Sequence, residues 1–341
     1  MTTRTPREKI ILKTALLGES VIDWPQFYCS TREDVVQILK INEFHLSNPR
    51  DHTALMSLQS EAIGYIQNQL RLTLPVSLLK PTSIEDIFFA ASDLKDPKTQ
   101  KLACALLKVM NVIHLLNGRE LLYNLSISNR NLFSLVEDKM ERELSSLTRI
   151  GIKYQGGRKQ KESLITRIIS KKGTLGVPTH DRLRFQIVTP KKENLLEVIL
   201  HLFQTVLPVN YVIPNLSVNR LINLRDTLPW KHRASYAFSK KLKSINNHLI
   251  TSLPYAIPDK EHSGKKYDLI KFVVAVPVRL DHYVSNSQHP LESLGCITHV
   301  PVEIRMMDQE TERLNNLGEN VYSLYKERQR IGVTKRVIQG A

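Results

Sequence analysis

The residues that follow a double glycine at 156–157 have the types and spacing of a phosphate-binding site. Lys159, Ser163 and Arg167 are four residues apart, which would place them on one face of a helix. Two cations and a hydroxyl close to the free N–H groups of a helix N-terminus suit a phosphate chain, and Arg158 adds a further cation. The alternative is a basic helix face in solvent. The double glycine itself is not a P-loop, because the spacing G-x-x-x-x-G-K-[ST] is absent.

Two carboxylates are candidates for binding Mg²⁺ beside such phosphates. Asp181 directly precedes the alternating run R-L-R-F-Q-I-V-T and is one of few acidic residues in a basic region. A carboxylate that opens a strand and faces phosphates is a typical Mg²⁺ ligand, although a lone Asp there is often a turn residue. Glu303, on a second predicted strand, would be its partner. Glu303 and Arg305 are two residues apart and share a strand face, which is either solvated or lines a site.

The net charge of +15 is concentrated in the middle of the chain. Between residues 151 and 250, 18 Lys and Arg stand against 5 Asp and Glu, a net charge of +13. A basic field of this kind attracts polyphosphates or a nucleic-acid backbone. Solubility through surface lysines is the other explanation.

The first 150 residues predict a helical domain. A capping box at Ser30 precedes one helix, an apolar pattern runs from Pro97 to a C-cap at 117–118, and Ser128 begins another helix. His114 lies in an apolar helix face and is expected to be a packed core histidine rather than a metal ligand.

Residues 151–330 predict a second domain of the α+β class, followed by a tail at 331–341. A glycine loop at 151–160 and a helix ending at 173 precede strands at 182–189, 271–280 and 301–307, and a helix at 193–207 separates the first two strands. From Asp308 a single long helix is expected, with an apolar stripe formed by Leu314, Leu317, Val321 and Leu324. The segment 208–266 has no clear assignment.

The sequence indicates a cytoplasmic protein with no membrane partner. It has no apolar N-terminal run of a signal peptide and no stretch of about 18 apolar residues to span a bilayer. Cys29, Cys104 and Cys296 are widely separated and predict neither a disulfide framework nor a metal knuckle.

The end of the chain resembles the end of the RelA/SpoT-type alarmone synthetase domain. That family has a strand E-I-Q-I-R-T followed by a helix with G-V-A-A-H-W-x-Y-K. Here the strand is E-I-R-M-M-D from Glu303, and Gly318, Tyr325 and Lys326 match the Gly, Tyr and Lys. The family strand G-Y-Q-S-I-H resembles K-Y-D-L-I-K at 266–271. The resemblance covers about residues 150–330, and the helical N-terminal part would belong to a lesser-known bacterial branch.

The resemblance implies a nucleotidyltransferase-like mixed β-sheet flanked by helices, and it assigns roles. The basic helix with Lys159, Ser163 and Arg167 would bind ATP phosphates, and Asp181 and Glu303 would hold Mg²⁺. Tyr267 would stack on the acceptor base and Lys271 would replace the family's histidine. Glu303 would otherwise orient the acceptor hydroxyl, and Arg305 would reach a phosphate.

Departures from the family pattern leave two functions open. At the end of the first strand, the family's Arg is replaced by Gln186. After the final Glu, the family's Gln is replaced by Arg305 and its next Arg by Met307. The first Arg of the family's R-x-K falls on Gly157, and Arg158 is the residue that follows it. The first function is Mg²⁺-dependent transfer of pyrophosphate from ATP to a hydroxyl of a nucleotide or an RNA such as tRNA. The second is a non-catalytic RNA- or nucleotide-binding protein on the same fold.

Overall fold

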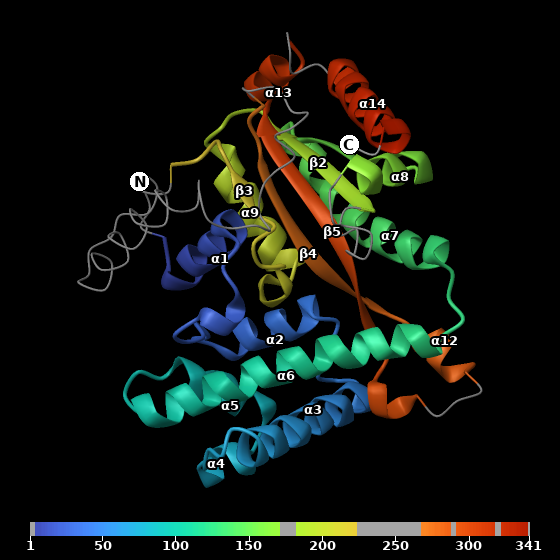
Figure 1. The fold of residues 1–341 in the computed structure, drawn as a ribbon. Helices are drawn as coiled ribbons and strands as arrows, with labels where there is room; N and C mark the ends of the chain where they lie inside the picture. Colours follow the sequence, from blue (N-terminus) through green and yellow to red (C-terminus); the bar gives the residue numbers. More distant parts are fainter. Residues whose placement is uncertain (1–3, 171–181, 224–266, 288–290, 318–321, 340–341) are drawn as a thin grey trace.

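The computed structural model describes residues 4–170, 182–223, 267–287, 291–317 and 322–339 (Figure 1). A five-stranded mixed sheet forms its centre, in the order β1 (Lys153–Arg158), β2 (Leu183–Thr189), β5 (Ile297–Asp308), β4 (Ile270–Arg279) and β3 (Val218–Asn219). Strands β2 and β5 are parallel, and the other pairs are antiparallel. The predicted α+β class with a helical N-terminal region is confirmed.

Helices make up most of the remaining chain. The N-terminal region contains α1 (Pro6–Leu17), α2 (Arg32–Ile41), α3 (Pro49–Asn68), α4 (Val76–Leu79), α5 (Ile84–Ser92), α6 (Pro97–Asn124) and α7 (Asn129–Leu147). Helices within and after the sheet are α8 (Lys161–Ser170), α9 (Asn194–Thr205), α12 (Asp281–Ser285), α13 (Gln309–Asn315) and α14 (Tyr322–Gln339). Short 3₁₀ turns are η1 (Val21–Asp23), η2 (Thr148–Ile150), η3 (Val209–Tyr211) and η4 (Glu292–Leu294).

Two hydrophobic cores hold the elements together. One lies against a single face of the sheet and includes side chains of α1, α7, α9 and the end of α6. The other packs α2, α3, α5 and most of α6 together. The predicted domain boundary at 150 falls between α7 and β1, yet the sheet core takes in α1 and α7 from the N-terminal side of that boundary.

The double glycine lies in strand β1, so the predicted loop at 151–160 is wrong. Glycine is unfavourable in strands, which is why the sequence suggested a loop. Gly156 pairs with Phe185 across the strands, and a Cβ on Gly156 would lie 2.4 Å from the Phe185 ring. The glycine therefore gives the buried aromatic ring room to lie over the strand.

Helix α6 continues to Asn124, past the C-cap predicted at 117–118. Gly118 is a packing residue, since a Cβ there would lie 2.8 Å from Nδ1 of His299 on β5. The hydroxyl of Thr298 donates to the Gly118 carbonyl at 2.7 Å. The first capping box also differs by one residue, because Thr31 rather than Ser30 caps α2.

The single helix predicted after Asp308 is also wrong. Helix α13 ends at Asn315, and α14 begins at Tyr322 and runs without a break past residue 330, where a separate tail was predicted. Leu314, Leu317 and Leu324 are about half exposed, so they do not form the predicted buried stripe. Val321 lies outside the described residues.

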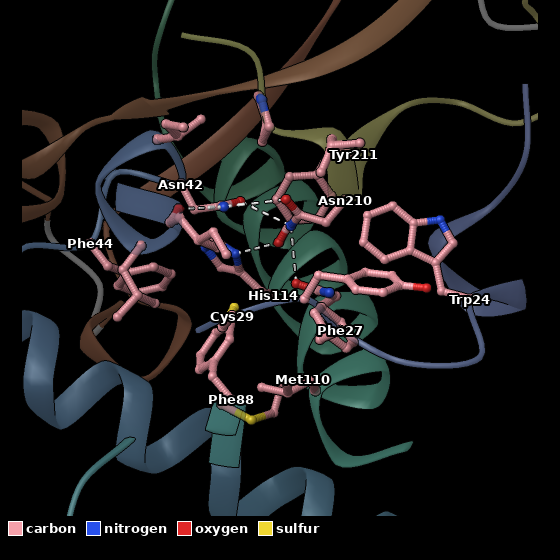
Figure 2. Close-up of a pocket in the computed structure, with 18 of the residues that line it drawn as sticks. Trp24, Phe27, Cys29, Asn42, Phe44, Phe88, Met110, His114, Asn210 and Tyr211 are labelled. Carbon is pink, nitrogen blue, oxygen red and sulfur yellow. Dashed lines mark hydrogen bonds between the residues drawn. The ribbon is translucent and has the colours of Figure 1, made fainter. Parts of the chain in front are cut away.

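A polar seam joins the two cores around a cavity of about 80 Å³ (Figure 2). Asn42, the C-cap residue of α2, and Asn210 on η3 exchange side-chain hydrogen bonds of 3.0 and 3.3 Å. Nδ1 of the buried His114 lies 2.6 Å from the Tyr211 hydroxyl oxygen, as expected for a packed core histidine. Amide and aromatic contacts of this kind fix the helical region against the sheet.

Candidate anion-binding face of the sheet

The two faces of the sheet differ sharply in chemistry. Leu183, Phe185 and Ile187 of β2 and their neighbours on β4 and β5 fill the sheet core. Since alternate residues of a strand point to opposite sides, the intervening positions form the other face. We call the second face the polar sheet face and define it by Arg184, Gln186, Lys271, Glu303 and Arg305.

The register of the strands brings these five side chains into two adjacent rows. One row contains Gln186, Arg305 and Lys271, which are direct neighbours across β2, β5 and β4. In the next row Arg184 is the direct neighbour of Glu303. Directly opposed side chains on one sheet face lie within contact reach, so basic side chains of both rows lie beside the Glu303 carboxylate. At the edge of the face, the Gln186 amide donates to the Glu312 carboxylate of α13 at 3.4 Å.

Glu303 is the buried acid of this face, with only 2% of its surface exposed. Its Oε1 accepts a hydrogen bond of 2.7 Å from Nε of Arg305. Burial by itself would raise the pKa of Glu303, but the charges of Arg305 and Lys271, with smaller effects from Lys159 and Arg184, lower the pKa below its ordinary value. The carboxylate is therefore ionised at neutral pH.

Lys159 joins the cluster from the end of β1. Its backbone N–H donates to the Arg182 carbonyl at 2.8 Å, which extends the strand pairing up to the start of α8. Lys159 thus precedes the helix on which its spacing suggested it would lie. Burial lowers the pKa of Lys159 to about 7, and the charges of Arg167, Arg305 and Arg184 act in the same direction, against an opposite effect of Glu303.

Helix α8 supplies the remaining predicted basic-helix residues and packs along α14 (Figure 1). The Lys326 ammonium of α14 donates to the Ser163 hydroxyl at 3.2 Å, and Arg336 donates to the Ile169 carbonyl. Arg167 on α8 lies near enough to Lys159 to lower its pKa. The last helix of the chain therefore stabilises the position of α8.

Two predicted site residues are placed away from the polar sheet face, and a third is not described. Arg158 pairs with Leu183 in the β1–β2 register and so lies on the core side of the sheet edge, where its Nε donates to the Glu137 carboxylate at 2.8 Å. Tyr267 precedes β4, is partly buried and packs against the sheet core. Asp181 lies outside the described residues.

Two residues at or near the polar sheet face were not predicted as site residues. Arg184 lies beside Glu303 on this face. Lys326 contacts Ser163 on α8, and the sequence had matched it to the family's lysine without giving it a role in the site. Strand alternation contained a signal, because Arg184 and Gln186 alternate with the apolar Leu183, Phe185 and Ile187 of β2. The partnership of Arg184 with Glu303 required the parallel register of β2 and β5.

Comparisons with protein-family models, with curated proteins and with solved structures give no match to this chain. Within the ranges that the structure describes, no helix is long and apolar enough to cross a membrane. The same ranges contain no group of three or more His, Cys, Asp and Glu side chains that could hold a metal ion. The polar sheet face is thus defined by its own geometry: one buried, ionised carboxylate among crowded cations.

Proposed function

We propose that the polar sheet face binds the polyphosphate of ATP and that the protein transfers pyrophosphate from ATP to a hydroxyl of a nucleotide or an RNA. The observation that carries the proposal is the crowding of four basic side chains, Lys159, Lys271, Arg184 and Arg305, near the buried Glu303. Like charges held close together repel one another, and a bound polyanion relieves that repulsion. The resemblance of residues 150–330 to the RelA/SpoT-type domain supports the same proposed function.

The reaction requires positioning and charge neutralisation more than covalent catalysis by the protein. An acceptor oxygen forms a bond to the β-phosphorus of ATP, the bond from that phosphorus to the α,β-bridging oxygen breaks, and AMP leaves. The ionised Glu303 would accept a hydrogen bond from the acceptor hydroxyl, whose proton passes through the carboxylate to solvent. The cations would hold the transferred phosphates and the AMP phosphate.

Mg²⁺ fits this proposal only as an ion held jointly by the protein and the nucleotide. Glu303 is a single carboxylate, and it is paired with Arg305. Mg²⁺ commonly uses one or two carboxylates together with substrate phosphates. If Glu303 and the predicted Asp181 hold the ion, Glu303 takes this role in place of the contact to the acceptor hydroxyl, and the ion would neutralise charge on the phosphates.

The direct test is the release of AMP from ATP and Mg²⁺ with GDP, GTP or tRNA as the acceptor. Wild-type protein should release AMP with at least one acceptor, and Glu303→Gln should reduce the rate at least about 100-fold. Glu137→Gln is the matched control, because Glu137 pairs with Arg158 on the other side of the sheet and should leave the rate unchanged. Absence of AMP with every acceptor would reject the transferase.

The second candidate function is nucleotide or RNA binding without turnover. It is favoured by the ion pair between Glu303 and Arg305, which engages the carboxylate that the reaction would use. RNA affinity should then fall steeply with salt, because each phosphate contact releases counterions. Salt-insensitive binding would count against this function.

A further inference from the structure

A second cavity lies far along the strands from the polar sheet face. It has a volume of about 590 Å³ and lies between α3, the middle of α6, α12 and the turn that leads into β5. Small-molecule sites generally have volumes of about 300–1,000 Å³. Strand β5 begins at this cavity with Ile297 and reaches the polar sheet face only at Glu303. The cavity is therefore separate from the proposed nucleotide site.

Helix α3 gives the cavity a cationic wall. Arg50, Thr53 and Ser57 line it and are spaced at i, i+3 and i+7, so they follow one face of the helix. All three residues are exposed to solvent. The Thr53 hydroxyl donates to the Pro49 carbonyl at 3.0 Å. The Arg50 guanidinium beside the Ser57 hydroxyl is still a suitable environment for a carboxylate, because Arg can donate two parallel hydrogen bonds to it.

Helix α12 gives the cavity an anionic wall. Asp281 and Ser285, at i and i+4, line it from this side, and 42% of the Asp281 side chain is exposed. Hydrogen bonds from Arg279 lower the pKa of Asp281 to about 2, so this carboxylate is ionised. Arg279 also binds the buried Asp51 at 2.8 and 3.0 Å. Because Asp51 lies on α3 and Asp281 on α12, the two carboxylates share one guanidinium between the walls, and Asp281 is the more exposed of the two, at 42% against 2%.

Apolar side chains cover the space between the two walls. Phe44 and Leu58 contribute from the helical region, and Val284 and Ile297 contribute from the α12 side. A ligand that fits all three surfaces carries a carboxylate, an ammonium group and an apolar side chain. We propose that this cavity is a binding site for a free α-amino acid with an apolar side chain, oriented by Arg50 at its carboxylate and by Asp281 at its ammonium group.

Calorimetric titration of the full chain with L-leucine, L-methionine and L-phenylalanine tests the proposal. At least one of them should bind with a Kd below about 1 mM. N-acetyl-leucine lacks the ammonium group and leucinamide lacks the carboxylate, so each should bind at least about tenfold more weakly than leucine. No binding by any of the three amino acids up to about 10 mM, or equal binding of the capped analogues, would overturn the proposal.

Two variants locate the site. Arg50→Gln removes the carboxylate partner and Ser285→Trp fills the cavity from an exposed position, and each should weaken amino-acid binding at least about tenfold. Arg130→Gln, an exposed Arg that does not line the cavity, is the matched control and should bind like the wild type. Equal binding by Ser285→Trp and wild type would place the ligand elsewhere. ATP titration of the same samples measures binding at the polar sheet face. Loss of amino-acid binding and loss of ATP binding are therefore observed independently, so the amino-acid site and the nucleotide site can each fail without the other.

Discussion

Arg158, Arg167 and Arg184 are close in sequence, but they lie in different electrostatic surroundings. Arg158 donates to Glu137 and Ser134 on α7, whereas Arg167 and Arg184 lie near Lys159. The affinity for an anionic ligand depends on how close each positive charge lies to the ligand, and position in the sequence does not determine that distance. The structure therefore separates three arginines that a basic sequence segment makes equivalent.

This separation predicts how nucleotide affinity responds to the loss of each charge. Arg184→Gln and Arg167→Gln should each weaken ATP binding about tenfold or more, since a hydrogen bond to a charged group contributes about 1.5–3 kcal/mol. Arg158→Gln should change the affinity less than about twofold. Titration calorimetry measures the three constants. An effect of Arg158→Gln as large as that of Arg184→Gln would contradict the assignment of the polar sheet face.

Lys159 predicts a pH dependence of the same binding. Its pKa of about 7 means that the ammonium loses its proton above neutral pH in the free protein. A bound polyphosphate favours the charged form and raises this pKa, so ATP affinity should fall as the pH rises from about 7.5 to about 9, where the phosphates are already fully ionised. Lys159→Arg retains its charge throughout and should bind ATP with an affinity that changes little over this range. An equally steep fall in the variant would exclude Lys159 as the cause.

At the scale of an element, the two glycines of β1 have opposite environments. A Cβ on Gly156 would overlap the fully buried Phe185 ring, while a Cβ on Gly157 meets nothing within 4 Å. Gly156→Ala should lower the free energy of unfolding by about 1–3 kcal/mol, the usual cost of overpacking. Gly157→Ala should change it by less than about 1 kcal/mol, because its Cβ would meet open space. Urea unfolding of both variants checks this, and equal losses would contradict the strand assignment.

At the scale of the whole molecule, the seam between the two cores depends on neutral histidines. Burial lowers the pKa of His114 to about 4 and holds the pKa of His299 well below its ordinary value. The unfolded chain therefore binds more protons below about pH 6.5, and stability is lost as the pH falls from there toward the folded pKa. His299 has both ring nitrogens buried without a hydrogen-bond partner, so protonation there is not compensated.

The expected loss from His114 alone is about 2 kcal/mol in the free energy of unfolding between pH 7.5 and pH 5. Urea unfolding at a series of pH values measures it. His299→Gln should reduce the pH dependence, whereas His52→Gln, at an exposed position of α3, should leave it unchanged. A stability that is flat between pH 6.5 and pH 4.5 would contradict a neutral, buried histidine pair.

The sequence by itself determined the local features. Alternation predicted β2, β4 and β5, apolar periodicity and caps predicted α7 and α9, and His114 was correctly expected in a core. These features depend on side chains a few residues apart, whose spacing is visible in the chain.

Only the tertiary structure decided which residues meet. The parallel pairing of β2 with β5 places Arg184 beside Glu303, although the two are far apart in sequence. Contacts between distant residues also explain two glycines that the sequence suggested were in a loop or a cap. Gly156 lies in a strand, where it leaves room for the Phe185 ring, and Gly118 lies within a helix, where it leaves room for His299. Glycine is read as a loop or cap residue from local preference, but a missing Cβ also permits close contact, and that contact depends on a partner that local sequence does not reveal.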